Sequence, residues 1–567
     1  MAHAPIVADR YSFVFMSVRI SRQTIPFQTE RVDWISPDDP RYSRFACYPH
    51  PALMRTGEPL MVDLQVVQIE NSYFRIQIAP SLGGRVVSWF DLGSQLELLG
   101  PPPSALHPNE SRGVELRHGI ELVVGSVPRM NSLGPVDFEL FEPEDEQSSG
   151  GILMHEQSVR HGISWHLSIY ARPDDPRLSF ECRAIRFSAG QVQTNFGLLI
   201  HSGELSQFHH TSGVMINSNH SSQQWLIESE PGEFFSSTPH ENAVLIAARE
   251  PDLNWPVGQT ETLTCHVAAG PENEKIDLCQ NGIAAIISNP LKIWAFQPIE
   301  NVPISAKCGE ESLKATATAS YRNPFIGRLP SEPTSLRVKL AEGEVQWPLE
   351  NLTMDTHIRH RERKPCYRPE ALFLRALYSS HKGNREKTLS LLEIALAHNG
   401  ENHITWWAVA AFSRNLGIES EAIEQVHALA PLEPLARAEA FLSIPEQHGK
   451  DPHPLVKPLA NDPDAMLEVA NTLLKFGLKE DAIKWIDECL RHREIPLLRY
   501  VLAYQHLPKM KVEAASQVAL VENTPLDPPY PLRSQEIGAI LQLTEAFPDS
   551  RRLAKLNQIL TEYAGKQ

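Results

Sequence analysis

The sequence predicts a large antiparallel β-sandwich followed by a short array of paired helices. Three observations predict this order. From about Thr24 to Leu349, apolar and polar residues alternate with a period of two, which is typical of strands with one buried face. From Ala371 onward the apolar spacing changes to three and four, which is typical of helices. A glycine-containing pattern then recurs within the helical part, which indicates repeated helical pairs.

The length of the chain predicts more than one domain. Its 567 residues exceed the roughly 250 to 300 residues at which single hydrophobic cores stop growing. The change of period falls near the charged, proline-flanked stretch THIRHRERKPCYRPE. We therefore expect an N-terminal extension over residues 1–36, a β-sandwich over 37–354, a linker over 355–368 and helical repeats over 369–567.

The strands of the first part are predicted from alternation. In SYFRIQI and in SWHLSIY every second residue is a large apolar one, so one face of each strand lies in a core and the other faces water or a ligand. Many such strands without intervening helices predict a sandwich or barrel. A region of this length is either one sandwich with many long strands or two smaller β-domains in series.

The helices of the second part are predicted from an internal repeat. The pattern G-x-x-x-x-[AT]-[IL] occurs three times, and an alanine stands seven residues before each glycine, at Ala376 and Gly383, Ala410 and Gly417, and Ala470 and Gly477. The first two copies are 34 residues apart, which is the tetratricopeptide period. Each glycine is expected to end a helix in a left-handed cap. The alternative is an ordinary bundle of helical hairpins. Residues 431–461 and 495–535 are proline-rich, so the array is expected to be short and irregular.

Composition and charge narrow the class of ligand and the cellular location that we expect. A net charge of −17 argues against a nucleic-acid partner, because phosphates need a basic face. The N-terminal residues do not resemble a secretory signal, and no run of about 18 apolar residues predicts a membrane span. The seven cysteines are scattered without a C-x-x-C pair, so we expect neither disulfides nor a cysteine zinc site, and no metal or cofactor. A cytoplasmic location is the resulting prediction.

Four short motifs carry a resemblance to a known family. They are Tyr48-Pro49, the I-E-N at Ile69 to Asn71, the P-x-x-G-G-R from Pro80 to Arg85, and the G-I-E at Gly119 to Glu121. Over about residues 37–140 the chain resembles an uncharacterised bacterial domain family with a galactose-mutarotase-like β-sandwich that is often followed by tetratricopeptide repeats. The resemblance implies a supersandwich of two large antiparallel sheets, a cleft on its concave face and a carbohydrate ligand.

The same resemblance implies proton-transfer chemistry on a sugar. In that superfamily a histidine and a carboxylate act on opposite sides of the ring, while an arginine holds hydroxyl groups. Arg85, which ends the G-G-R motif, is the best substrate-binding candidate. Glu115, six residues before Glu121, and His118, beside the G-I-E motif, are further substrate-binding candidates. Glu121 is the best catalytic carboxylate. The structural alternatives are an arginine that ties a turn to a strand and a glutamate in a buried ion pair.

Further candidates lie later in the β region. The segment GLLIHSGELSQFHH contains His201 and Glu204, which are candidates for an acid/base pair or a weak metal site if the chain turns at Gly203. Ordinary loop histidines are the alternative. Trp294 and Glu300, in WAFQPIEN, are candidates for sugar binding, because aromatic rings stack on sugars.

These features predict a carbohydrate-active protein that binds, and in the catalytic case epimerises or cleaves, a sugar in the sandwich. The enzyme classes implied are an aldose-epimerase-like protein or a glycoside hydrolase. The alternative is a non-catalytic carbohydrate-binding or protein-interaction scaffold. In that case the helical repeats bind a protein partner or pack on the sandwich as a cap.

Overall fold

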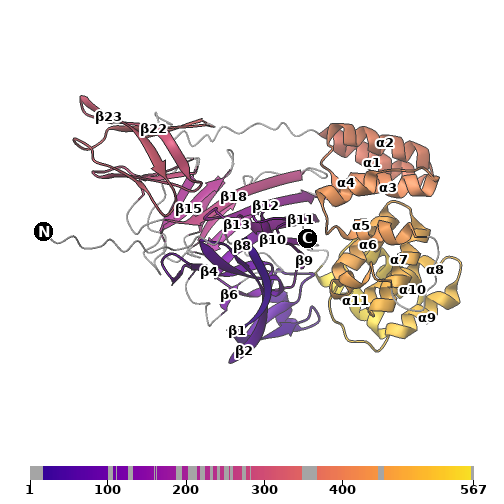
Figure 1. Cartoon of the computed structure of the whole chain (residues 1–567). Helices are drawn as coiled ribbons and strands as arrows, with labels where there is room; N and C mark the ends of the chain where they lie inside the picture. Colours follow the sequence, from indigo (N-terminus) through magenta and orange to yellow (C-terminus); the bar gives the residue numbers. More distant parts are fainter. Residues whose placement is uncertain are drawn as a thin grey trace.

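A computed structural model of the chain shows strands in its first two thirds and helices in the last third (Figure 1). The residues that the structure describes are 17–99, 106–109, 112–125, 132–158, 160, 162–186, 195–201, 213–217, 224–229, 234–238, 243–247, 255, 260–270, 276–280, 282–341, 343–347, 367–444 and 453–563.

Two antiparallel sheets form the main sandwich. The nine-stranded sheet runs in the order β1 (Arg19–Ile35), β2 (Ala52–Glu70), β3 (Phe74–Ala79), β4 (Arg85–Asp91), β8 (Gly119–Gly125), β13 (Asn195–His201), β17 (Ala243–Ala247) and β16 (Phe234–Thr238), with β5 (Leu96–Glu97) paired to β4. The seven-stranded sheet runs in the order β14 (Gly213–Asn217), β15 (Gln224–Ser229), β18 (Thr260–Ala269), β12 (Arg177–Arg186), β11 (Ile163–Ala171), β10 (Gly150–Ser158) and β9 (Asp137–Phe141).

Alternate residues of these strands form the core between the sheets. Ile120 and Leu122 of β8 and Trp165 and Leu167 of β11 belong to one buried apolar cluster. Each such side chain contributes about 1.5 to 3 kcal/mol by leaving water. The predicted period of two is therefore confirmed, and the residues between these positions point to the outer faces of the two sheets.

The β region after residue 277 forms a second, smaller pair of sheets, the alternative that the long period-two region left open. One has the order β19 (Leu278–Gln280), β20 (Ile283–Ile286), β21 (Leu291–Ala295) and β24 (Phe325–Gly327), and the other β23 (Glu311–Ala319), β22 (Ile299–Cys308), β25 (Ser335–Leu340) and β26 (Gly343–Trp347). Their facing side chains, including Ile293 and Val338, form a separate core. A short hairpin of β6 (His107–Asn109) and β7 (Gly113–Glu115) lies within the main β region.

The ends of the predicted β-domain differ from the sequence prediction in one respect. Strand β1, which lies inside the expected extension 1–36, pairs with β2 along most of its length, and its Phe27 and Ile35 are buried. The described part of that segment is therefore a strand of the sheet. Of the expected linker 355–368, residues up to 366 lie outside the described part of the chain, and the first helix begins at Tyr367.

The described C-terminal region is a chain of helices. They are α1 (Tyr367–His381), α2 (Arg385–His398), α3 (His403–Leu416), α4 (Ala422–Leu429), α5 (Pro434–Leu442), α6 (Pro463–Lys475), α7 (Lys479–His492), α8 (Pro496–His506), α9 (Lys511–Val521), α10 (Ser534–Ala546) and α11 (Arg551–Glu562). Packed pairs are α1 with α2, α3 with α4, α6 with α7, α8 with α9, and α10 with α11. None of these helices has the length and apolar character needed to cross a membrane.

The repeat motif has the structural role that the sequence predicts. Gly383, Gly417 and Gly477 lie at the turns of three helical pairs with φ of 75°, 69° and 71°. The prolines of the irregular segments behave differently from the expectation. Pro496 stands in the first turn of α8, where a missing N–H costs no helical hydrogen bond. Residues 495–535 therefore contain a regular helical pair, whereas residues 431–461 hold only α5 and a 3-10 helix, Lys457–Asn461, in their described part.

The helical array packs against the outer face of the seven-stranded sheet, on one side of the molecule (Figure 1). Four polar residues stand directly opposite one another on successive strands of that face, namely Asp137, His155, His166 and Arg183. Each contacts the array. Asp137 accepts a hydrogen bond from Arg437 of α5 at 3.0 Å, and Arg183 donates to the carbonyl of Glu401.

The Tyr48-Pro49 segment also reaches the helices. The Tyr48 hydroxyl donates to the carbonyl of Pro531. The rings of Tyr42 and Tyr48 lie 5.1 Å and 6.1 Å from the ring of Tyr563, between centroids. The array is therefore a cap on the sandwich, held by both polar and aromatic contacts.

Candidate functional site

Three of the predicted site residues lie on neighbouring strands of the nine-stranded sheet. Arg85 begins β4, Glu121 lies in β8 and His201 ends β13. In the register of β8 and β13, Glu121 is opposite Leu199 and His201 is opposite Gly119, so Glu121 and His201 are diagonal neighbours on one face. Because Ile120 of β8 points into the core, that face is the outer one.

A glycine brings β8 close to β4 at this point. Gly119 has φ of 77°, and a Cβ there would lie 2.0 Å from the carbonyl oxygen of Val86. The missing side chain therefore permits the close approach. As a result, the Arg85 guanidinium donates through Nη1 to the carbonyl of His118 and through Nη2 to Oε2 of Glu121. Both side chains of this ion pair are buried.

The second oxygen of Glu121 holds His201. Nε2–H of His201 donates to Oε1 of Glu121 at 3.2 Å. Burial lowers the pKa of His201, and the hydrogen bond and charge of Glu121 only partly oppose it. The ring is therefore neutral at pH 7 with its proton on Nε2, and Nδ1 is buried without a hydrogen-bond partner among the described residues. A carboxylate that fixes one histidine tautomer leaves the other nitrogen as a proton acceptor.

Glu115 and His118 are buried nearby but have different partners. Glu115 accepts a hydrogen bond from Nδ2 of Asn109 at 2.8 Å and forms an ion pair with Arg117. His118 donates from Nε2 to the carbonyl of Val87 at 2.8 Å. These bonds fasten the β6–β7 hairpin and the start of β8 beside Arg85.

Two other predicted site residues, Trp294 and Glu300, do not lie beside Arg85, Glu121 and His201. Trp294 of β21 is buried in a cluster with Leu226 and Phe296, between the main sandwich and the smaller sheets. Glu300 of β22 is exposed to solvent. Glu204 lies outside the described residues.

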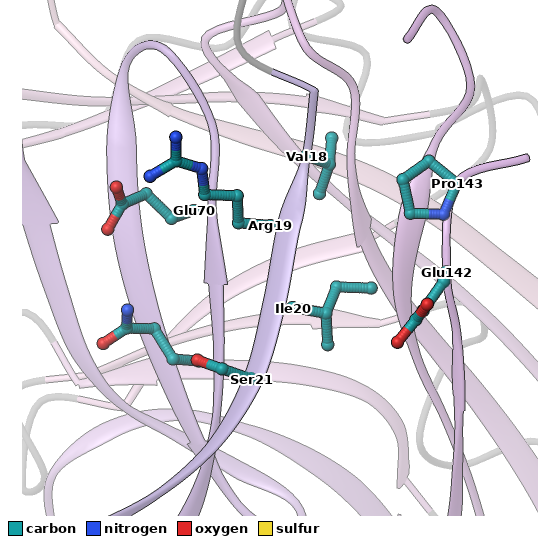
Figure 2. A pocket seen from close by; sticks show the side chains of 8 residues that line it. Val18, Arg19, Ile20, Ser21, Glu70, Glu142 and Pro143 are labelled. Atoms are coloured by element: carbon teal, nitrogen blue, oxygen red, sulfur yellow. The ribbon is translucent and has the colours of Figure 1, made fainter. Parts of the chain in front are cut away.

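A surface pocket of about 470 Å³ lies elsewhere on the β region (Figure 2). It is lined by Val18, Arg19, Ile20, Ser21, Gln68, Glu70, Glu142 and Pro143. In Figure 2, Arg19, Ser21 and Glu70 lie toward the left of the view, and Glu142 and Pro143 lie on the right. None of the predicted site residues lines this pocket.

A second polar group on the sandwich was not predicted from the sequence. His155 and His166 occupy outward positions of strands whose other residues are largely buried, and they meet His403 and Glu433 of the helical array. The available signal was a histidine at the polar position of each of two apolar strands. The partners are more than 200 residues away in sequence, so only the fold brings them together.

Comparisons with known proteins give distant likenesses. No protein-family model and no curated protein matches the chain. A solved TPR-domain containing protein from Parabacteroides distasonis is 11% identical, with a TM-score of 0.34 over 94% of this chain and 96% of that one. A galactose mutarotase-like protein from Clostridium acetobutylicum is 6% identical, with a TM-score of 0.25 over 36% of this chain and 95% of that one. Likenesses of this size carry no argument about function. The architecture itself, antiparallel sheets followed by paired helices, confirms the predicted fold class.

Proposed function

We propose that the sandwich binds a carbohydrate at the outer face of the nine-stranded sheet and that His201 transfers a proton there. The observation that supports this proposal is the convergence of Arg85, Glu121 and His201, which three separate parts of the sequence contribute. The family resemblance of residues 37–140 supplies the class of ligand.

The chemistry fits the opening and closing of a sugar ring. A base removes the proton of the anomeric hydroxyl, the carbonyl forms, and the bond to the ring oxygen breaks as an acid protonates that oxygen. The carbonyl group then rotates about its bond to C2, and the freed ring-oxygen hydroxyl attacks its other face while the two protons are transferred back. This gives the second anomer, so the step needs no external reactant. Nδ1 of neutral His201 is suited to the base role, and Glu121 stabilises the imidazolium that forms. Arg85 is a positioning residue that holds Glu121, and Glu204 remains the proposed second proton-transfer group.

A thermal-shift screen of the full chain with monosaccharides and oligosaccharides tests the binding. A sugar at one hundred times its dissociation constant should stabilise the protein by about 2.7 kcal/mol. Glu121→Gln and His201→Gln, which keep side-chain size, should lose most of the shift. His398→Gln, at an exposed position of α2, should keep it. The proposal fails if no sugar stabilises the wild type, or if both site variants respond as it does.

A protein-interaction role is the second candidate, favoured by one observation. Leu374 and Tyr378, one turn apart on α1, are 47% and 67% exposed. Affinity capture with the full chain and with a Leu374→Ser, Tyr378→Ser double variant tests it. A partner specific to this face is lost in the variant, and an identical set of captured proteins argues against it.

A further inference from the structure

A buried group of three histidines and one glutamate lies where the sandwich meets the helical array. His155 of β10 and His166 of β11 are directly opposite each other, with ring centroids 4.4 Å apart. His403 is the first residue of α3, and its ring meets the edge of the His166 ring at 5.7 Å. Glu433 caps the N-terminus of α5. Two elements of each half of the molecule therefore contribute one side chain each.

The distances bring the donor atoms to the dimensions of a metal site. Oε2 of Glu433 lies 3.1 Å from Nε2 of His403 and 3.9 Å from Nε2 of His155. Ligand atoms of His155, His166 and Glu433 all lie within 4.8 Å of one another. In a tetrahedral zinc site with bonds near 2.05 Å, donor atoms are separated by about 3.3 Å. His403 is not part of this set of three and meets it through Glu433.

The burial of the group requires an explanation. His155, His166, His403 and Glu433 are exposed by 1%, 4%, 1% and 0%. Both ring nitrogens of His166 lack a hydrogen-bond partner among the described residues, and leaving such groups unpaired inside a protein is costly. Burial lowers the pKa of His155 to about 3 and that of His166 well below its ordinary value. Neutral imidazoles are the form that binds metal ions.

A metal-free arrangement is also available to part of the group. The Ser164 hydroxyl lies 3.2 Å from Nε2 of His155 and 3.2 Å from Oε2 of Glu433, so it can link the two by hydrogen bonds. This series of hydrogen bonds includes neither ring nitrogen of His166. His403 contacts Glu433 at 3.1 Å, so metal-free contacts account for three of the four side chains and leave His166. A bound cation accounts for all four.

We propose that His155, His166, His403 and Glu433 bind one divalent transition-metal ion, Zn²⁺ in the first place, between the sandwich and the helical array. Three nitrogen donors and one carboxylate oxygen form a set that zinc accepts with tetrahedral geometry. Four protein ligands in a closed site indicate a structural ion rather than a catalytic one. Ser164 Oγ and the backbone N–H of Leu435, which donates to Oε1 at 3.4 Å, orient the carboxylate.

The metal content of the full chain tests this directly. Protein stripped with a chelator, reloaded with Zn²⁺ and dialysed should retain close to one ion per chain by mass spectrometry. Reloading with Co²⁺ should give the visible absorption of a four-coordinate ion. Both signals should fall at least about tenfold in His155→Gln and His166→Gln.

A matched control separates the site from other buried histidines. His492→Gln removes a histidine whose side chain is 6% exposed and pairs with Glu488 at 3.2 Å within α7, and this variant should retain the ion. Glu433→Gln, which preserves hydrogen bonding, should bind the ion more weakly even where it folds as the wild type does. The proposal is overturned if the wild type retains no Zn²⁺ and shows no cobalt spectrum, or if His155→Gln and His166→Gln bind as well as the wild type.

Discussion

Arg85 and Glu121 form a buried ion pair, which was one of the structural alternatives for these two residues. His201 lies beside the pair and contacts Glu121. A catalytic role for the three side chains stays a prediction. Removing one member of such a pair is expected to cost about 3 to 5 kcal/mol, because the other charge is left buried.

The titration of His201 gives a prediction at this scale. Its pKa in the folded protein lies below the ordinary value of 6.5 because the ring is buried. The folded state therefore binds fewer protons than the unfolded state, so this contribution to stability is present above about pH 6.5 and is lost as the pH falls through the folded pKa.

His201→Gln removes that contribution. Between about pH 7 and pH 5, the free energy of unfolding of the variant should fall by up to about 2 kcal/mol less than that of the wild type. Urea denaturation of both proteins across this range measures the difference, and the other histidines cancel because both chains contain them. Parallel pH curves would show that His201 does not titrate as the buried ring requires.

Much of the candidate site on the nine-stranded sheet could be predicted from the sequence, residue by residue. The group of histidines and one glutamate between the sandwich and the helical array could not. Arg85 and Glu121 stand in motifs with glycines, which mark close backbone approach. His155 and Glu433 stand in segments without such a motif and meet only because a helix start packs on a strand face. Trp294 illustrates the opposite difficulty, since an aromatic residue in a β-core and one on a sugar platform look alike in sequence.

At the scale of elements, the turns of the helical pairs were the most predictable part of the array. A left-handed position after a helix selects glycine for a local steric reason, so the signal survives without knowledge of the fold. The prolines of residues 495–535 were interpreted as breaks, yet Pro496 initiates a helix. Local sequence does not distinguish the two roles unless the helix boundary is already known.

Two glycine substitutions are expected to change the free energy of unfolding in opposite directions. Gly417 ends α3 with φ of 69°, and a Cβ there would meet no atom within 4 Å. Gly417→Ala should therefore destabilise the protein by about 1 kcal/mol through backbone strain alone. Gly538, inside α10, also has open space around it, and Gly538→Ala should stabilise by about 0.5 to 1 kcal/mol.

Thermal or urea unfolding of the two variants measures both effects. Equal losses of stability would indicate that the alanine side chain, and not the backbone conformation, determines the outcome.

At the scale of the whole molecule, the helical array covers a face of the sandwich, as one of the two sequence-based alternatives required. Polar residues in register across four strands meet partners on α3 and α5 and on the turn before α3. Tyr42 and Tyr48, near the start of the chain, meet Tyr563, the residue that follows α11. The two predicted parts are thus joined by contacts that no local pattern reports.

The ion pair of Asp137 with Arg437 can be used to measure the strength of the contact between the sandwich and the helical array. Both side chains are largely buried, at 19% and 12% exposed, with a contact of 3.0 Å. A double-mutant cycle with Asp137→Ala and Arg437→Ala should give a coupling of about 1.5 kcal/mol or more. The exposed pair of Arg31 and Asp33, at 3.6 Å, should give about 0 to 1 kcal/mol. Equal coupling energies for the two pairs would show that the Asp137–Arg437 ion pair is no stronger than a surface ion pair.

We propose that His201, held by Glu121, moves a proton on a sugar. Nuclear magnetic resonance can follow the approach of freshly dissolved α-anomers of aldoses to equilibrium with the full chain present. We predict that the wild type and His398→Gln accelerate equilibration of at least one aldose and that His201→Gln and Glu121→Gln do not. Equilibration at the buffer rate for every sugar tested, or equal acceleration by the His201 variant, would contradict the claim.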